Sequence, residues 1–336
     1  MNITAQDRVP LLALIDRFPR QRVVLLGDLV ADEFIYGEIA RVSREAPVLI
    51  LKQRERQVVP GGGANAANNL VDLGAKVTVV GVVGDDDAGH ALLHYFREKG
   101  ISTRHVLCHP GFLTPTKSRI LGGLTHWQRQ QIVRVDREPP ESPAQEIRSR
   151  LTRAALPSMR TASALLASDY GYGSTNSREV EYLRVHAGRR LPITVDSRYD
   201  LLSYKRITAA TPNEPEVEAA FGLPIGNNLE RLHSLGRKLL RRQALQALLI
   251  TRGRDGMVVF EPRHAPRHLP IFGADQAVDV TGAGDTVIAA FTLALAAGAG
   301  FLHAAMLANC AGGIVVMKRG TATVTGRELR EAIRNA

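Results

Sequence analysis

The chain has 336 residues, of which 45% are hydrophobic and 5% aromatic, and it carries a formal net charge of +10. The apolar stretch after Asp285 is broken by Gly298 and Gly300, so a membrane-spanning segment is not expected. The N-terminus lacks the basic and apolar regions of a signal peptide, and Cys108 and Cys310 form no recognisable metal or redox motif. We therefore expect a cytoplasmic globular protein whose two thiols are free.

The excess of basic residues is compatible with nucleic acid, an acidic lipid surface or phosphorylated small molecules as partners. The basic residues are dispersed, however, and the pairs at 189–190, 237–238 and 241–242 fall on expected helices. Such pairs usually mark solvated helix faces. No zinc-finger, RNP-type or Lys/Arg-tract motif is present, so we expect neither nucleic acid nor a membrane as partner.

Short apolar runs typical of buried strands alternate with helical patterns along most of the chain. This alternation predicts one domain over residues 1–336, with a mostly parallel sheet covered by helices on both faces. In such folds, ligands bind beyond the carboxyl ends of the strands. Strands are expected at 22–27, 76–84, 163–168, 193–197, 246–251 and 256–261, and helices at 64–73, 89–99, 177–190, 215–221, 228–243, 286–297, 303–317 and 326–335.

Two segments, 33–59 and about 113–136, interrupt this alternation. They lack helical periodicity and contain strand-like pieces such as FIYGEI, PVLILKQ, KSRILGG and QQIVRVD. We expect the two segments to form one small β-sheet that stands off the main domain as a lid.

GDLVAD, residues 27–32, follows the first expected strand and places Asp28 and Asp32 four residues apart at a strand end. Paired carboxylates at such a place suit the binding of sugar hydroxyls. An equally good interpretation is that both are acids of a solvent-exposed loop.

Further on, PGGGANAANN (60–69) joins a strand to a helix. Its glycines allow the backbone to pass close to a ligand, and Asn65 can both donate and accept hydrogen bonds. This stretch favours a polyhydroxylated ligand, and it lacks dinucleotide-binding and P-loop spacings.

Two weaker patterns follow. TPNEPE (211–216) places Asn213 and Glu216 at an expected helix start. The simpler interpretation is that these residues cap the helix. The functional interpretation is that they support a magnesium ion and the phosphates of a nucleotide. TRGRDGM (251–257) predicts a turn before a hairpin. His126 and His233 have no ligand spacing and are expected at the surface.

DVTGAGD, residues 279–285, precedes an alanine- and leucine-rich helix. The amides and dipole of a helix N-terminus attract anions, and the small residues Gly282, Ala283 and Gly284 allow a phosphate to approach the backbone. Asp285 is then either an N-cap or a base that takes the proton of a hydroxyl attacking that phosphate. The stretch by itself does not decide between the two.

Taken together, GDLVAD, PGGGAN, TPNEPE, TRGRDG and DVTGAGD occur in the order of the ribokinase-like sugar kinase family, also called the phosphofructokinase B family. The chain resembles that family over about residues 22–330. The resemblance implies a ribokinase-like three-layer α/β/α fold with a mostly parallel central sheet and a small β-sheet lid. It also implies a phosphotransferase that uses ATP and Mg²⁺, with a homodimer formed through the lid.

Within the family, the chain is similar to the D-glycero-β-D-manno-heptose 7-phosphate kinases. This similarity implies transfer of the γ-phosphoryl group of ATP to O1 of the heptose 7-phosphate, which gives the 1,7-bisphosphate. Gly63, Tyr172 and the stretch 121–129 depart from that group's pattern. A different sugar, sugar phosphate or nucleoside as acceptor, and a non-catalytic sugar sensor, therefore stay open. The similarity is carried by residues 27–48, 130–138, 168–173 and 318–325.

The resemblance also implies roles for particular residues. Asp285 would be the base, and the amides of Gly282, Ala283 and Gly284 would hold the developing negative charge. Asp279 would face a monovalent cation such as K⁺. The residues that would hold the sugar are Asp32, Gly61, Gly62, Asn65 and Asp169. Its 7-phosphate would be bound by Arg44 and Arg134. The residues that would hold Mg-ATP are Asn213, Glu216, Thr251, Gly253 and Asn309, and Glu216 would also support the Mg²⁺ indirectly.

Overall fold

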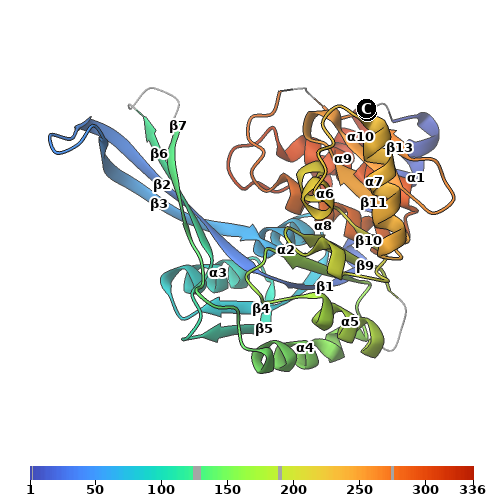
Figure 1. Cartoon of the computed structure of the whole chain (residues 1–336), viewed down its shortest axis with the longest axis horizontal. Helices are drawn as coiled ribbons and strands as arrows, with labels where there is room; N and C mark the ends of the chain where they lie inside the picture. Colours follow the sequence, from blue (N-terminus) through green and yellow to red (C-terminus); the bar gives the residue numbers. More distant parts are fainter. Residues whose placement is uncertain (2, 124–129, 188–190, 274–275) are drawn as a thin grey trace.

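A computed structural model gives the structure of the chain and describes residues 1, 3–123, 130–187, 191–273 and 276–336. Its main body is a sheet layered between helices, and a second, smaller sheet projects from this body (Figure 1). The three-layer α/β/α fold with a β-sheet lid, which the sequence predicts, is thereby confirmed.

In the described part of the chain, the central sheet has nine strands in the order β13-β12-β11-β10-β9-β8-β1-β4-β5. From β11 to β5 neighbouring strands run parallel, whereas β12 and β13 are antiparallel. The carboxyl ends of the parallel strands therefore meet at one edge of the sheet, where a site is expected. The bounds are β1 Arg22–Gly27, β4 Lys76–Gly84, β5 Ser102–His109, β8 Ala164–Asp169, β9 Ile193–Ser197, β10 Ala209–Ala210, β11 Ala247–Thr251, β12 Met257–Phe260 and β13 Arg267–Leu269.

Two hydrophobic clusters lie on the two faces of this sheet. On β1, Val23 and Leu25 belong to one cluster and Val24 and Leu26 to the other, as the two-residue period of a strand requires. Helices α1, α2, α3, α8, α9 and α10 complete the first cluster, and α4, α5, α6 and α7 complete the second. Burial on both faces explains why inner strands such as β1 and β8 are nearly continuous apolar runs.

Most of the helices match the expected positions, and several begin with a side-chain cap, such as the capping boxes of α6 and α10. Among the described residues, no helix combines the length and the apolar composition that crossing a membrane requires. The bounds are α1 Ala5–Ile15, α2 Gly63–Asp72, α3 Asp87–Glu98, α4 Gln145–Met159, α5 Ser177–His186, α6 Glu214–Phe221, α7 Leu229–Arg242, α8 Ala283–Ala296, α9 Phe301–Val315 and α10 Gly326–Asn335, with short 3₁₀ turns at Phe18–Arg20, Leu201–Ser203 and Gly253–Asp255.

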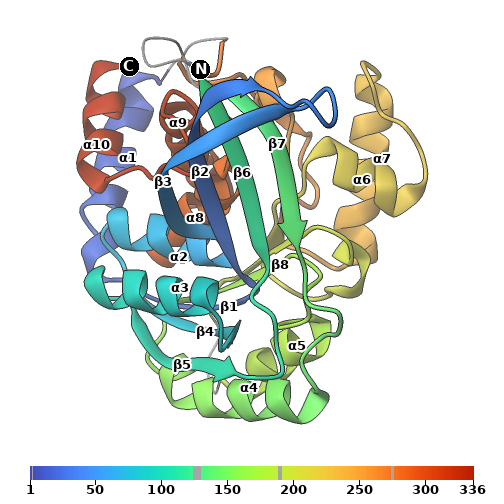
Figure 2. The same cartoon turned by 90° about the vertical axis from the view of Figure 1, so that its left-hand side faces the viewer.

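The second sheet is the lid, with the strand order β3-β2-β6-β7. It consists of β2 Leu29–Val42, β3 Leu49–Gly62, β6 Thr116–Gly123 and β7 Gln130–Arg137. Figure 2 shows these four strands crossing in front of the main body. The long strands β2 and β3 continue into the main body next to β1 and α2, so the lid is anchored where the central strands end.

Several details differ from the sequence-based expectation. The lid strands begin at Leu29, before the expected 33–59 segment, and α8 begins at Ala283 rather than at residue 286. Helices α1 and α4 were not among the expected helices; both contain a proline, which normally disfavours a helix interior. Strand β5 was also missed. His126 and most of the 121–129 stretch, together with residues 188–190 of the expected helix 177–190, lie outside the described residues.

Candidate active site

Residues 279–285 border three cavities at the carboxyl edge of the central sheet. The first, of 280 Å³, is lined by carboxylates and is called the acidic cavity here. The second, of 290 Å³, is lined mainly by apolar side chains of α8, α9 and the β11–β12 hairpin and is called the apolar cavity. The third, of 960 Å³, lies between this segment and the lid strands and is called the lid cavity. The DVTGAGD segment can thus contact more than one ligand at once.

Asp285 lies in the first turn of α8, and only 3% of its surface is exposed. Nδ2 of Asn65 donates a hydrogen bond to one carboxylate oxygen at 2.9 Å, and the hydroxyl of Tyr170 donates to the other at 2.7 Å. Burial raises the pKa of Asp285 to about 7, although these two hydrogen bonds favour the charged form. A carboxyl group with such a pKa can take up and release a proton near neutral pH, as a general base must.

A buried chain of hydrogen bonds fixes the orientation of Asn65. Asn69, one turn further along α2, donates from Nδ2 to Oδ1 of Asn65 at 3.1 Å, and the hydroxyl of Thr286 donates to Oδ1 of Asn69 at 3.0 Å. Gly282 has a φ of 75°, and a Cβ there would lie 2.5 Å from Nδ2 of Asn65. Glycine at this position therefore serves both the turn and the close approach of the Asn65 amide to Asp285.

The three small residues of DVTGAGD form the start of α8. Gly282 is the N-cap, so no side chain occupies the amides of the first turn. The amide of Ala283 donates to the carbonyl of Val280 at 3.2 Å within the turn. Gly282, Ala283 and Gly284 all line the acidic cavity, so the structure places the predicted anion-binding amides beside Asp285.

Four carboxylates line the acidic cavity: Asp169, Asp196, Glu216 and Asp285. Burial raises the pKa of Asp196 well above its ordinary value, and the negative charges of the other three raise it further. Burial also raises the pKa of Glu216. Arg198 lines the same cavity and favours the charged forms of Asp196 and Glu216. Such crowding of buried carboxylates is the arrangement in which oxygen-ligated cations bind.

Asp196 was not singled out in the sequence, although its strand was expected at 193–197. Its signal was its place next to the last residue of a parallel strand, where ligand-binding side chains collect. Tyr170 was likewise missed as a partner of the base, since only its surrounding stretch 168–173 attracted notice.

Asn213 and Glu216 satisfy the structural and the functional interpretation at the same time. They form the capping box of α6, with the amide of Asn213 donating to Glu216 at 2.9 Å and the amide of Glu216 donating to Asn213 at 2.8 Å. Both also line the acidic cavity. Asp169 lines it too, but its carboxylate accepts hydrogen bonds from the hydroxyls of Ser197 and Tyr204, both at 2.8 Å.

The interpretation of Asp28 and Asp32 as a pair of acceptors for one ligand needs a correction. Asp28 is completely buried, and its carboxylate accepts hydrogen bonds from the backbone amides of Tyr170, Tyr172 and Ser174 at 2.7–3.0 Å. Burial raises its pKa to about 6. Asp28 therefore holds the loop that carries Tyr170, because its lone pairs are directed at that loop rather than at a cavity.

Asp32 connects the lid to the main body. Its carboxylate accepts a hydrogen bond from Nη1 of Arg119 on β6 at 2.7 Å and another from the hydroxyl of Thr321 at 2.8 Å. A Cβ on Gly61 would lie 2.7 Å from the carboxylate carbon, so only glycine leaves room for Asp32 here. Gly62, the N-cap of α2, has a φ of 52°, and Tyr170 packs against it. The predicted sugar-binding residues Asp32, Gly61 and Gly62 are therefore adjacent to one another.

The lid cavity carries positive charge on both of its walls. Arg119 contributes from the lid strand β6, and Arg319 contributes from the loop after α9. Arg134 is the cross-strand partner of Arg119 and forms an ion pair with Asp136 at 2.8 Å. Arg44 lies exposed in the turn between β2 and β3, outside the residues that line this cavity. The structure therefore brings Arg134 close to the cavity wall and leaves Arg44 at the far end of the hairpin.

Asp279 lies where DVTGAGD meets the loop after α9. Its two carboxylate oxygens accept hydrogen bonds from the amides of Thr281 and Gly320, both at 2.9 Å. The carboxylate therefore ties the two loops together, and its remaining lone pairs are the part of it that could contact a cation.

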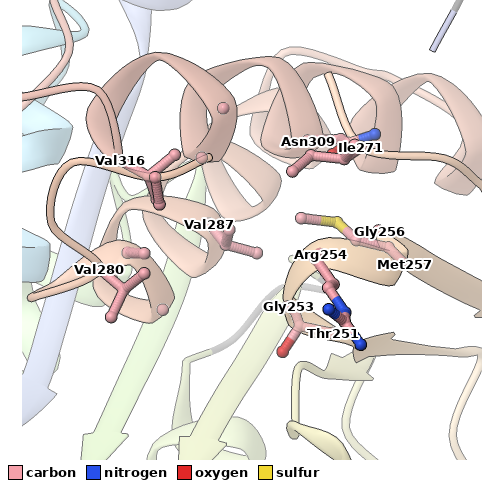
Figure 3. A pocket seen from close by; sticks show the side chains of 15 residues that line it. Thr251, Gly253, Arg254, Gly256, Met257, Ile271, Val280, Val287, Asn309 and Val316 are labelled. Atoms are coloured by element: carbon pink, nitrogen blue, oxygen red, sulfur yellow. The ribbon is translucent and has the colours of Figure 1, made fainter. Parts of the chain in front are cut away.

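Figure 3 shows the apolar cavity, with Val280, Val287 and Met257 around a common space. The predicted nucleotide-binding residues Thr251, Gly253 and Asn309 line the same cavity. Nδ2 of Asn309 donates to the carbonyl of Pro270 at 2.7 Å, which ties α9 to the segment after β13. An apolar space with polar groups at its rim is typical of a small-molecule binding site.

Comparison with known proteins identifies the family of this chain. The family model for pfkB family carbohydrate kinases matches residues 21–137 and 177–326. Bifunctional protein HldE of Desulfatibacillum aliphaticivorans is 38% identical over 95% of this chain, and HldE of Geobacter metallireducens is 40% identical over 91%. The chain spans 64% and 61% of the length of these two relatives, respectively.

Solved structures resemble the fold. Ribokinase of Arabidopsis thaliana, complexed with ribose and ATP, superposes with a TM-score of 0.72 at 20% identity and covers 94% of this chain and 98% of its own. Phosphofructokinase-2 of Escherichia coli, in complex with substrates and products, superposes with a TM-score of 0.74 at 16% identity, with 94% and 99% covered. At these identities the likeness concerns the fold.

A buried carboxylate at a helix N-terminus, beside an acidic cavity, an apolar cavity and a lid, suits an enzyme that transfers a group between two bound ligands. The chain belongs to the pfkB family of carbohydrate kinases. It is accordingly a phosphotransferase that acts on a sugar hydroxyl, and the resemblance stated from its sequence is confirmed.

Proposed function

We propose that this chain is an ATP-dependent kinase that phosphorylates O1 of D-glycero-β-D-manno-heptose 7-phosphate and produces the 1,7-bisphosphate. The observation that carries the proposal is the 35–40% identity to proteins named HldE over nearly the whole chain, together with the sequence resemblance to heptose 7-phosphate kinases. The proposal concerns the kinase reaction alone, because the chain spans less than two thirds of the length of these relatives.

Asp285 is the proposed base. It would accept the proton of the sugar hydroxyl while the oxygen attacks the γ-phosphorus, and the bond from phosphorus to the leaving ADP oxygen would break. The amides at the start of α8 would stabilise the negative charge that develops on the phosphoryl oxygens. Tyr170 and Asn65 orient the Asp285 carboxylate, and burial keeps water away from it.

The acidic cavity fits a divalent cation. Asp196 and Glu216 are held near Asp285 in a space where their mutual repulsion makes a bound cation favourable. Mg²⁺ bound there would neutralise charge on the nucleotide phosphates. The residues that would support it are Asp196, Glu216 and Asn213. The lone pairs of Asp279 are available for a monovalent cation such as K⁺.

The lid cavity is the proposed sugar site. Asp32 lies next to this cavity, because Arg119 and Thr321, which line it, donate hydrogen bonds to its carboxylate, and it would accept hydrogen bonds from sugar hydroxyls. Arg119 and Arg319 lie on opposite walls, so they are better placed than Arg44 to bind a terminal phosphate of the sugar, and Arg134 lies one strand further. Arginine suits this role because its planar group binds phosphate through two hydrogen bonds.

We also propose that two chains pair through the outer face of the lid. Because side chains alternate along a strand, Ile120 and Val133 point away from the cavity that Arg119 and Leu121 line. Val133 and Val135 are 44% and 52% exposed. An exposed apolar sheet face of this kind is usually covered by another molecule.

A coupled assay of ADP release across a panel of sugars tests the function. The panel should contain the heptose 7-phosphate, the unphosphorylated heptose, ribose, fructose, fructose 6-phosphate and nucleosides. We expect the highest kcat/KM for the heptose 7-phosphate. A preference for another compound would overturn the substrate assignment and leave the kinase assignment intact. Tight binding of a sugar with no ADP release would instead favour a sugar-sensing protein.

A further inference from the structure

A second group of potential ligands lies away from the active site, where β4 and β5 end. Cys108 is the partner of Val83 near the end of β5, Asp85 follows β4, and His90 lies in the first turns of α3. One ligand atom of each of these three side chains lies within 4.8 Å of the others. Three chain segments therefore bring a thiol, an imidazole and a carboxylate together.

Hydrogen bonds hold these three side chains at distances close to those between the ligands of a bound metal ion. Nε2 of His90 lies 2.8 Å from Oδ1 of Asp85, and Sγ of Cys108 lies 3.8 Å from the same oxygen. A tetrahedral Zn²⁺ with bonds of about 2.0–2.3 Å separates its ligand atoms by roughly 3.3–3.6 Å. Shifts of about 1 Å or less would give that spacing. The side chains of Asp85 and His90 are about half exposed, so such shifts meet little resistance.

We propose that Cys108, His90 and Asp85 form a binding site for Zn²⁺ or a similar borderline-soft divalent ion, with water as the fourth ligand. The donor set selects this class of metal, because a thiolate and an imidazole bind Zn²⁺ and Co²⁺ far better than they bind Mg²⁺. Binding replaces the proton of the Cys108 thiol with a metal–sulfur bond and releases that proton to solvent. The site is separate from the proposed Mg²⁺ site and does not rest on the proposed function.

The position of this site connects it to the lid. Thr114 lies two residues before the lid strand β6. Its hydroxyl accepts a hydrogen bond from the amide of Gly84 at 2.8 Å, and its amide donates to Asp86 at 2.9 Å. Asp85 lies between these two anchors. A metal bound to Asp85 would therefore fix the turn that anchors the lid strand to the main sheet.

Titration of the purified chain with Co²⁺, followed by absorption spectroscopy, tests the proposal. A cobalt–thiolate bond gives a charge-transfer absorption that carboxylate and imidazole ligands do not produce. We expect this absorption to saturate at about one Co²⁺ per chain and to disappear when Zn²⁺ is added. Cys108→Ser should abolish it, and His90→Gln should weaken Co²⁺ binding at least about tenfold.

The chain offers two matched controls. His94 and Glu98, one turn further along α3, form a similarly exposed imidazole–carboxylate pair at 3.2 Å with no thiol beside it, so His94→Gln should change nothing. Cys310 is buried in α9, so the absorption should persist in Cys310→Ala. The proposal is overturned if no cobalt–thiolate absorption develops in the folded wild-type chain, or if the absorption survives Cys108→Ser. Circular dichroism of each variant verifies that it is folded.

Discussion

The buried part of the site in the main body and the outer strands of the lid are built differently. On the main-body side, Asp285, Asn65 and Asn69 are buried and joined by hydrogen bonds within the cluster. On the lid side, charged groups such as Arg134 and Asp136 are largely exposed and neutralise one another in ion pairs. A buried network holds one geometry, whereas an exposed ion pair exchanges partners at little cost. This comparison supports our proposal that the main body fixes the phosphoryl-transfer chemistry and that the lid determines which sugar is bound.

The largest effect should come from the buried side of the site in the main body. Asp285→Asn removes the proposed base, and we expect kcat to fall by at least about 10²-fold because the carboxylate that would accept the hydroxyl proton is lost. ATP binding, measured by calorimetry, should change little, since the apolar cavity is untouched. Turnover close to that of the wild type in a folded variant would contradict the assignment of Asp285.

The next largest effect should come from the arginines of the lid cavity. Arg319→Ala should lower kcat/KM for the phosphorylated sugar by about 10- to 100-fold and spare the unphosphorylated sugar, because a charge-assisted contact to phosphate is lost. Arg319 is the cleaner position to test, since Arg119 also holds Asp32.

Arg134→Ala and Arg44→Ala provide the comparison for this result. We expect a smaller loss of selectivity for Arg134→Ala than for Arg319→Ala, and the smallest for Arg44→Ala, because Arg44 lies in the exposed turn of the lid. A loss for Arg44→Ala as large as that for Arg319→Ala would instead favour the original sequence-based assignment of the phosphate site. An equal loss on both sugars would mean that the arginine supports structure only.

A smaller effect is expected on the pH dependence. The base must be deprotonated to act, so kcat/KM should fall as the pH drops below about 7, the pKa of Asp285. The hydroxyl of Tyr170 stabilises the charged carboxylate, and Tyr170→Phe should therefore move this acidic limb to higher pH. At pH 7 the loss should be on the order of 3- to 10-fold.

Tyr204→Phe is the matched control for that experiment. The hydroxyl of Tyr204 is also buried and donates to a carboxylate, but to Asp169 rather than to Asp285. The acidic limb should stay in place in this variant. If both variants shift the limb equally, the titrating group is not Asp285 alone.

The smallest effect should appear in the lid itself. Sugar bound between the two walls should order β6 and β7, so amide hydrogen exchange there should slow by a few-fold, while exchange in the buried strand β1 stays unchanged. Mass spectrometry of exchange with and without saturating sugar measures this difference. Equal exchange in β6 and β7 under both conditions would argue that the lid is already rigid.

The sequence by itself determined the alternation of strands and helices, the parallel sheet and the position of DVTGAGD at a helix start. Apolar periodicity and glycine placement are local signals, and they identify elements without reference to the rest of the chain. Helices α1 and α4 were not predicted, and each contains a proline, whose local cost is compensated by packing of the apolar helix face against the core.

Only the tertiary structure decided how the side chains of the site are used. Asp28 and Asp32 look alike in GDLVAD, yet one is directed at a neighbouring loop and the other at the lid, because the pleat and the following strands determine their partners. The pKa of Asp285 depends on burial by segments more than a hundred residues away, such as those of Asn65 and Tyr170. The contribution of Asp196 to the acidic cavity likewise required the order of β8, β9 and β10 in the sheet, which a single strand pattern does not contain. Partners distant in sequence set these properties, and so the residue types alone could not reveal them.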